Sequence, residues 1–282
     1  METIAASIII PAHNEALVIE KTLSELSREI PHNLYEIIVV CNACADNTAN
    51  IVLKFSDVKL LETNKASKTH ALNLGDSIAA GDIRIYMDAD VTMQAKNIEK
   101  MIMILKNDDF LAVSPNVKMD HTGSSWFVRA YYNIWFQLPY VKEGFMGGGV
   151  YALSAKGRKR FDFFPDVISD DGYIRELFNI NETKRIGDIF SIVRSPKTLS
   201  GLIKIKTRSR LGLYELKNKH PDIYGSHKKS YRSSIINLFK KPTNWPKIII
   251  YFFINIRCRI NAKRIFNNNE NFVWETDTSS RQ

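Results

Sequence analysis

Residues 83–90 read IRIYMDAD, a short apolar run that ends in two carboxylates. The run at 83–87 has the composition of a β-strand, which places Asp88 and Asp90 directly after its end. Residues two apart in an extended chain point the same way, so both carboxylates can address one ion. Carboxylate oxygens suit Mg²⁺ or Mn²⁺, and such an ion can bridge a diphosphate. The stretch predicts a divalent metal site at the end of a strand.

Similar apolar runs alternate with helical patterns through the first half of the chain. Strands are expected at 6–10, 36–40, 58–61 and 83–87, and helices at 20–30, 48–55 and 69–80. Continuous apolar strands separated by helices indicate a parallel sheet covered on both faces. Ligands of such sheets lie beyond the C-terminal ends of the strands. Residues 11–15, 41–46 and 88–90 are therefore expected along one rim.

The second half of the chain has a less regular pattern. Residues 124–141 are rich in aromatic side chains and predict a half-buried helix, with acceptor binding as the alternative. Gly147, Gly148 and Gly149 precede a strand expected at 150–153. A glycine triplet permits close approach of a ligand to the backbone, and it is also an ordinary flexible turn. Both interpretations remain open from the sequence.

A second pair of carboxylates, Asp170 and Asp171, precedes a helical pattern at 173–178. Ser169 or Asp170 could cap this helix. Alternatively, the pair could supply a general base that takes a proton from an acceptor hydroxyl. Adjacent carboxylates raise one another's pKa, which would suit a base.

The composition, 45% hydrophobic and 24% charged, excludes a disordered or fibrous chain. The net charge of +9 is concentrated at 196–266, where 17 Lys and Arg face two acidic residues. This imbalance indicates an anionic partner such as nucleotide phosphate, a lipid headgroup or nucleic acid, or else a solvated basic face. Nucleic acid is the least favoured of these partners. Four of the cations could bind a diphosphate or form a solvated helix face: Lys204, Lys206, Arg208 and Arg210.

The apolar stretch at 245–256 is followed by a cluster of basic residues at 257–264. It is too short to span a bilayer, which takes about 20 residues. The pattern fits a helix on a membrane surface, and a closing helix packed on the core is the alternative. Residues 1–7 lack the basic start of a secretory signal. A cytoplasmic protein, peripheral at the inner membrane surface, is therefore expected.

Three cysteines are too few for a disulfide framework, and they favour a reducing compartment. Cys41 and Cys44 form a Cys-x-x-Cys sequence between an expected strand and an expected helix. That context also suits a redox motif or half of a zinc site. The remaining cysteine and histidines form no recognisable second pair of zinc ligands. A redox motif and a zinc site are therefore minor alternatives.

Taken together, these segments resemble the family 2 glycosyltransferases, which have the GT-A fold. The resemblance covers about residues 5–215 and rests on the order and spacing of its motifs. The motifs lie at 7–15, 37–40, 45–48, 68–75, 88–90, 147–154 and 169–171. The resemblance implies a Rossmann-like, mostly parallel α/β sheet flanked by helices, followed by a helical basic C-terminal extension.

The resemblance also implies a division of the chain into three parts. The GT-A domain is expected at 1–215, with a nucleotide-sugar-binding half at 1–115 and an acceptor and catalytic half at 116–215. A basic helical extension would follow at 216–266, and a polar tail at 267–282.

The family implies an inverting, single-addition hexosyltransferase that moves a sugar from a nucleotide-diphosphate sugar to an acceptor hydroxyl. Asp171 would be the general base with Asp170 beside it, and Mg²⁺ or Mn²⁺ would bind Asp90 and Asp88. Expected nucleotide and sugar contacts are Pro11, His13, Glu15, Asn42, Asp46, Lys68, Asp88, Arg208 and Arg210. Expected acceptor contacts are Gly147, Gly148 and Gly149.

Two departures from the family pattern bear on specificity. Cys41 and Asn42 stand where the family usually has an Asp-Asp pair, one of which reads the base. A UDP-sugar is the expected donor, but this replacement leaves the base open. Residues 207–211 lack the Gln-x-x-Arg-Trp of processive members, which favours single addition. The acceptor is expected to be a saccharide or a lipid-linked molecule.

Two other functions compete with sugar transfer. A nucleotidyltransferase acting on a sugar phosphate would use a similar fold and metal carboxylates, but residues 11–15 lack its glycine-rich, lysine-bearing loop. A non-catalytic nucleotide-binding relative is the other alternative, and it gains weight from the Cys41 and Asn42 replacement.

Overall fold

The computed structural model describes residues 4–139, 141, 144–145, 148–225, 238–239 and 241–268. The chain forms two compact units. The first unit consists of Met1–Lys118 and Phe145–Val193, and the second of Met119–Gly144 and Arg194–Gln282.

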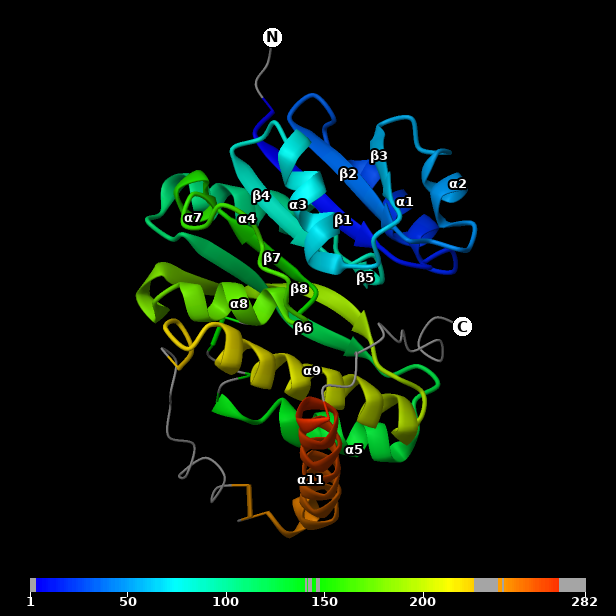
Figure 1. Ribbon diagram of the computed structural model, residues 1–282, viewed down its shortest axis with the longest axis vertical. Coiled ribbons are helices and arrows are strands. Elements are labelled where there is room, and N and C mark those ends of the chain that lie inside the picture. Colours follow the sequence, from blue (N-terminus) through cyan, green and yellow to red (C-terminus); the bar gives the residue numbers. More distant parts are fainter. Residues whose placement is uncertain are drawn as a thin grey trace. The chain divides into compact units, whose positions relative to one another are not determined.

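The first unit is built on a mixed sheet with the strand order β3-β2-β1-β4-β7-β6-β8-β5 (Figure 1). The strands are β1 (Ala6–Ala12), β2 (Tyr35–Asn42), β3 (Val58–Thr63), β4 (Ile83–Met87), β5 (Val91–Thr92), β6 (Ala112–Asp120), β7 (Val150–Leu153) and β8 (Thr183–Arg194). Strands β1 to β4 pair in parallel, whereas β7 is antiparallel to both β4 and β6. The α/β sheet with helices on its faces is confirmed.

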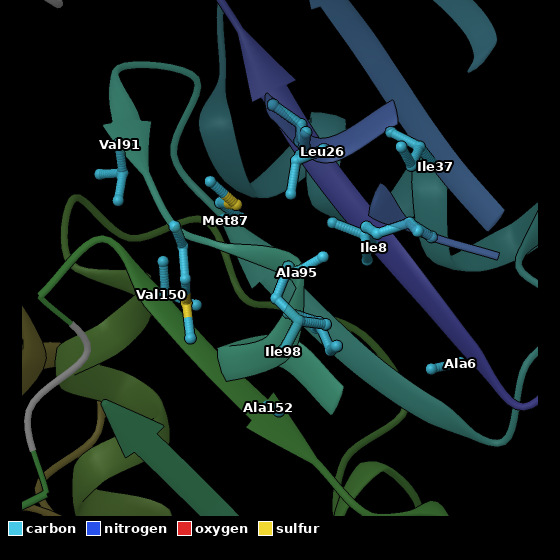
Figure 2. Packing of buried hydrophobic residues seen from close by; sticks show 14 of the residues in the cluster. Ala6, Ile8, Leu26, Ile37, Met87, Val91, Ala95, Ile98, Val150 and Ala152 are labelled. Carbon is cyan, nitrogen blue, oxygen red and sulfur yellow. The ribbon is translucent and has the colours of Figure 1, made fainter. Parts of the chain in front are cut away.

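Two hydrophobic clusters cover the two faces of this sheet, because successive strand residues point to opposite sides. Ile8, Ile37 and Met87 belong to the cluster drawn in Figure 2, together with α1 (Ile19–Glu29), α2 (Thr48–Val52) and α4 (Ala95–Asn107). Their strand neighbours Ile9, Ile38 and Tyr86 belong to the second cluster, with α3 (Lys68–Ile78) and α8 (Asp170–Leu177). The short helix α7 (Ala155–Arg158) and the 3₁₀ turn η1 (Ile180–Glu182) complete the unit.

Strand β1 continues through Pro11, where the sequence predicted that it would end. Pro11 pairs in parallel register with Val40 of β2. On its other side β1 pairs with β4 only as far as Ile9. No described strand pairs with Pro11 on this side, so a missing N–H there costs no ladder hydrogen bond.

Glu36 is a carboxylate buried at the start of β2, with 6% of its surface exposed. It accepts hydrogen bonds from Ser7 Oγ at 2.5 Å, Lys59 Nζ at 2.7 Å and the Ala80 backbone N–H at 2.6 Å. Burial raises the pKa of Glu36, but these hydrogen bonds and the Lys59 charge outweigh burial and lower the pKa below 4.5. Glu36 therefore joins β1, β2, β3 and the turn after α3.

We expect Glu36→Ala to lower the free energy of unfolding by about 3 kcal/mol, because it leaves buried donors without an acceptor. Since the folded pKa lies below the unfolded value, the stabilisation is present above pH 4.5 and is lost as the pH falls through the folded pKa. Urea denaturation of both proteins at pH 7 and pH 3 measures this. The exposed Glu62→Ala is the control, and an equal effect of the two variants would contradict the assignment.

The second unit is helical and contains α5 (Trp126–Trp135), α9 (Leu199–Lys219), η2 (Pro242–Asn244) and α11 (Trp245–Asn267). Helix α11 packs against both α9 and α5, and in Figure 1 it runs steeply across them. A shared apolar cluster joins the three helices, with Tyr131 of α5 stacked on Tyr251 of α11 at 5.1 Å between ring centroids. The helices expected at 124–141 and 245–256 occur as α5 and α11, and one face of α11 is packed.

Residue 215, the expected end of the GT-A domain, lies in the last turns of α9. Helix α9 packs with α5 and α11, so it continues past that limit within the second unit. Most of the polar tail expected at 267–282 lies outside the described residues. Among the residues that are described, no helix is long and apolar enough to cross a membrane.

Candidate active site

The C-terminal ends of β1, β2 and β4 form one rim of the sheet, and the loops after β1 and β2 are tied together there. Asn14 adopts a positive φ of 55°, and its Oδ1 accepts a hydrogen bond from the Ala45 backbone N–H at 2.7 Å. The Ala16 backbone N–H donates to Asp46 Oδ2 at 3.0 Å. Asp46 is exposed and joins the two loops. The nucleotide contact expected of Asp46 stays a prediction, in addition to this structural role.

Asn42, the expected base-reading residue, and two residues expected in the nucleotide pocket lie next to these ties. Asn42 is buried, and its Nδ2 donates to the Ala12 carbonyl oxygen at 2.8 Å. His13 Nδ1 lies 2.6 Å from the Asn42 carbonyl oxygen, and the Glu15 backbone N–H donates to Thr48 Oγ1 at 2.8 Å. The two strand ends thus bring His13, Glu15 and Asn42 together.

Cys41 and Cys44 are free thiols at the same rim. Cys44 Sγ accepts from the Asn14 backbone N–H and donates to the Ala12 carbonyl oxygen, both at 3.4 Å. The hydrogen bond with Cys41 is the main reason that the pKa of Cys44 is lowered to about 6. In the described part of the chain, no group of three or more His, Cys, Asp or Glu side chains is placed to hold a metal, so the zinc alternative gains no support.

Cys44 should be the reactive cysteine of the protein. We expect iodoacetamide to modify it at a rate that rises through about pH 6 and then levels off, because the thiolate is the nucleophile. Cys41 and Cys258 should react far more slowly, because both are buried and their pKa values are raised. Peptide mass spectrometry after timed alkylation measures each site, and equal labelling of Cys41 and Cys44 would count against this prediction.

Lys68, the first residue of α3, bridges two carboxylates. Its Nζ lies 2.6 Å from Asp88 Oδ1 and 2.9 Å from Asp170 Oδ1. Asp170 is 3% exposed, and its Oδ2 accepts a hydrogen bond from the Tyr151 hydroxyl at 3.0 Å. The sequence predicted Lys68, Asp88 and Asp170 as site residues, and the structure brings them into contact.

The electrostatics connect the remaining two carboxylates to this cluster. Burial is the main cause of a raised pKa at Asp88; the Lys68 charge lowers it, and the charges of Asp90 and Asp171 raise it further. Burial likewise raises the pKa of Asp170, opposed by Lys68 and reinforced by Asp171. The charges of all four aspartates therefore influence one another in a single cluster around Lys68.

Asp171 has a different environment from its neighbour Asp170. Ser169 is the N-cap of α8, because its Oγ accepts from the Gly172 backbone N–H at 3.2 Å. Asp171 Oδ1 accepts from the same N–H at 2.8 Å and from Ser169 Oγ at 2.7 Å. The cap thus holds Oδ1, and within the described residues Oδ2 has no such donor. Asp171 is partly exposed, so its second oxygen is available to a ligand.

Two of the three glycines have the backbone conformation that favours glycine. Gly148 and Gly149 have φ values of 48° and 80°. The Gly149 carbonyl oxygen accepts from the Asp88 backbone N–H at 2.8 Å, and a Cβ at Gly149 would lie 2.5 Å from Val91 Cγ2. A larger residue would not fit at position 149 beside Asp88, so this glycine has a specific structural role and is not simply part of a flexible turn. Gly147 lies outside the described residues.

The expected basic cluster lies on α9 in the second unit. Lys206 is partly buried, and its Nζ lies 4.5 Å from the ring centroid of Trp135 and 5.0 Å from that of Tyr132. Burial lowers the pKa of Lys206 to about 8. Lys206 therefore packs against aromatic rings and does not belong to a solvated basic helix face. The diphosphate contacts expected of Arg208 and Arg210 stay predictions.

Sequence reasoning missed Tyr151 and Asp76. The Tyr86 hydroxyl donates to Asp76 Oδ2 at 2.8 Å, and Arg158 Nε donates to the same oxygen at 2.8 Å. The rings of Tyr86 and Tyr151 lie 5.1 Å apart, which places this second buried network beside Asp170. The available signal was a tyrosine within each apolar strand, because a buried hydroxyl usually needs a partner.

The acidic residues fit a divalent ion that is completed by a ligand. Mg²⁺ is commonly bound through one or two carboxylates together with substrate phosphates. Asp90 is partly exposed and forms no ion pair with any other described residue, whereas one oxygen of Asp88 is held by Lys68. Asp90 and the second oxygen of Asp88 are therefore available at the rim as hard donors for such an ion.

Residues 7–162 match the family model described as Glycosyl transferase family 2. The chain belongs to this family. It is 35% identical over 112 residues to the "Probable glycosyltransferase YdaM" of Bacillus subtilis, covering 36% of this chain and 27% of that protein. It is 31% identical over 124 residues to the "Dolichol-phosphate mannosyltransferase" of Pyrococcus furiosus, covering 43% and 35%. The family 2 chain thus spans well under half the length of these curated relatives.

Solved structures share the fold of this family 2 chain at lower identity. A mannosyltransferase from Pyrobaculum calidifontis, in complex with GDP-Man and Mn²⁺, has a TM-score of 0.62 at 20% identity, covering 95% of this chain and 76% of that one. Glucosyl-3-phosphoglycerate synthase from Mycobacterium tuberculosis, in complex with Mn²⁺ and UDP, has a TM-score of 0.57 at 17% identity, covering 76% and 79%. These matches confirm the GT-A type of fold.

Proposed function

We propose that this family 2 chain transfers one sugar from a nucleotide-diphosphate sugar to an acceptor hydroxyl with inversion at the anomeric carbon. The observation that carries the proposal is the cluster in which Lys68 bridges Asp88 and Asp170, with Asp90 and Asp171 close enough to act on it. The P. calidifontis and M. tuberculosis complexes support it, since their names record a sugar nucleotide or nucleotide together with Mn²⁺.

Asp171 acts as the general base in this proposal. Its Oδ1 is held by the α8 cap, so Oδ2 takes the proton as the acceptor oxygen attacks the anomeric carbon. The bond between that carbon and the diphosphate oxygen breaks in the same displacement. Bound at Asp90 and Asp88, Mg²⁺ or Mn²⁺ would supply charge compensation for the departing diphosphate.

Lys68 and Asp170 act as positioning residues. Lys68 holds one oxygen of Asp88, and its charge offsets the repulsion between Asp88 and Asp170. The Tyr151 hydroxyl fixes the other oxygen of Asp170. Asp170 is fully engaged in these contacts, which favours Asp171 as the base.

The donor and the acceptor follow from the nucleotide rim and from the relatives. A UDP-sugar is the proposed donor, with Asn42 and His13 near its base, while a GDP-sugar is the alternative that the P. calidifontis complex suggests. The acceptor is a saccharide or a lipid-linked molecule. The name of the P. furiosus relative supports a lipid-linked acceptor.

Release of nucleoside diphosphate from a panel of UDP- and GDP-sugars, with Mn²⁺ and with EDTA, tests the function. We expect metal-dependent release from at least one sugar nucleotide, and its near loss in Asp90→Ala. Asp82→Ala, at an exposed aspartate before β4, is the matched control. Pyrophosphate release from a nucleoside triphosphate and a sugar phosphate would instead identify a nucleotidyltransferase. Tight nucleotide binding without turnover would identify a non-catalytic relative.

We further propose peripheral attachment to the cytoplasmic membrane surface through residues 245–266. The outer face of α11 exposes Ile249, Phe253, Ile256 and Ile260, each more than half exposed. These positions follow helical spacing and form an apolar stripe beside Arg257 and Arg264. Flotation with anionic liposomes tests this, and equal recovery of the wild type and Ile249→Ser/Phe253→Ser would reject it.

A further inference from the structure

The second unit contains an apolar cavity of about 320 Å³, lined mainly by α11, with Ile134 of α5, Arg210 of α9 and residues 238–239. Its walls include Ile134 and Leu138 from one side and Ile248, Phe252 and Ile256 of α11 from the other. The volume lies within the range of about 300–1,000 Å³ typical of small-molecule sites. Phe252 and Ile256 are also 41% and 59% exposed, so the cavity opens at the surface of α11.

The charged groups on the cavity wall are two guanidinium groups, those of Arg210 on α9 and Arg259 on α11. Among the described residues no carboxylate lines the cavity, and α11 carries five basic residues and no acidic one. Neither arginine forms an ion pair with another described residue. An anion at this cavity would therefore meet two donors suited to phosphate.

The remaining polar lining does not favour an extended peptide. Asn255 is the other polar side chain apart from the Tyr251 hydroxyl, and its Nδ2 already donates to the Tyr251 carbonyl oxygen at 2.8 Å. An extended peptide backbone placed here would leave N–H and C=O groups without partners, which is costly in an apolar site. A hydrocarbon chain has no such groups and needs only apolar walls.

We propose that this cavity binds one hydrocarbon chain of an acidic membrane lipid, with the lipid phosphate held between Arg210 and Arg259. This role of Arg210 replaces the diphosphate contact that the sequence predicted for it. The proposal rests on the membrane attachment proposed above and adds to it a saturable site for a single lipid. The exposed stripe of α11 would adsorb to the bilayer surface, whereas the cavity would take up one chain from it.

A soluble short-chain lipid separates this site from adsorption to a bilayer. We expect dihexanoyl phosphatidic acid, titrated below its micelle concentration by calorimetry, to bind with one-site saturation. Dihexanoyl phosphatidylcholine and inorganic phosphate should bind at least tenfold more weakly, because one lacks the net charge and the other lacks the chain. Equal binding of either compound would overturn the proposal.

Variants identify the residues of the site. Arg259→Gln should weaken binding of the phosphatidic acid about tenfold, the effect of losing one charge-assisted contact. Arg257→Gln, exposed on the same helix but off the cavity, should bind like the wild type. Leu138→Trp should fill the cavity and abolish binding while thermal unfolding remains cooperative. Unchanged binding in Arg259→Gln would refute the site even if Leu138→Trp fails to fold.

The stripe and the cavity are distinguishable in the same experiments. Ile249→Ser/Phe253→Ser, two residues that do not line the cavity, should lose liposome flotation and keep binding of the soluble lipid. Loss of both in that variant would contradict a separate site. Release of nucleoside diphosphate is scored independently, so failure of the lipid site leaves the proposed sugar transfer to its own test.

Discussion

Asp171→Asn should lower the turnover number by about 10²- to 10⁴-fold, the range for loss of a general base. An amide keeps the shape of the carboxyl group but does not accept the acceptor proton. The hydrogen bonds of Asp171 come from its own helix start, from Ser169 and Gly172. Nucleotide affinity and the melting temperature should therefore stay close to those of the wild type.

Steady-state release of nucleoside diphosphate, together with a nucleotide titration by calorimetry, measures both effects for Asp171→Asn. Asp162→Asn, at an exposed aspartate before α8, serves as the matched control and should keep full activity. If Asp171→Asn retained a turnover number within twofold of the wild type, another group would have to receive the proton.

Lys68→Met should lower the free energy of unfolding by about 3 kcal/mol and remove nearly all activity. The substitution takes away the ammonium group that lies within 3 Å of both Asp88 and Asp170, and leaves the buried Asp170 and the partly exposed Asp88 without their shared cation. Breaking a buried ion pair by removing one partner is strongly destabilising. Urea denaturation of both proteins at pH 7 measures the loss, with the exposed Lys65→Met as the control.

The pH dependence separates lost charge from lost packing in Lys68→Met. The pKa values of Asp88 and Asp170 are already raised by burial, and without Lys68 they should rise further. A carboxyl group whose folded pKa is raised stabilises the fold below its unfolded pKa and loses that effect as the pH rises. The deficit of the variant should therefore shrink between pH 7 and pH 4. A constant deficit would assign the effect to packing.

The strands of the first half could be predicted because their apolar runs are short and bounded by turns. The strands expected at 83–87 and 150–153 occur with those limits as β4 and β7. Strands β6 and β8 were not predicted, because both mix polar and apolar residues. Each pairs antiparallel with a strand that is distant in the sequence, β6 with β7 and β8 with β5. Pairing between distant segments depends on the tertiary fold, which local patterns do not record.

The candidate site could be predicted as a set of residues but not as a set of contacts. Position along the rim sufficed for Asp88 and Asp90, because both follow a parallel strand. The approach of Lys68 to Asp170 depends on where two helices begin, more than a hundred positions apart, and on the Ser67 cap that starts α3. The hydrogen bond from Tyr151 depends in addition on the antiparallel pairing of β7 with β4.

The ammonium group of Lys68 offsets part of the negative charge at the most crowded part of the rim. A protein that relied on a bound cation to separate Asp88 from Asp170 would lose its folded shape in a chelator. This chain carries that positive charge on its own helix, so stripping divalent ions should stop turnover and leave the melting temperature nearly unchanged. We therefore expect the rim to assemble before any metal binds, so the metal-free protein should remain folded.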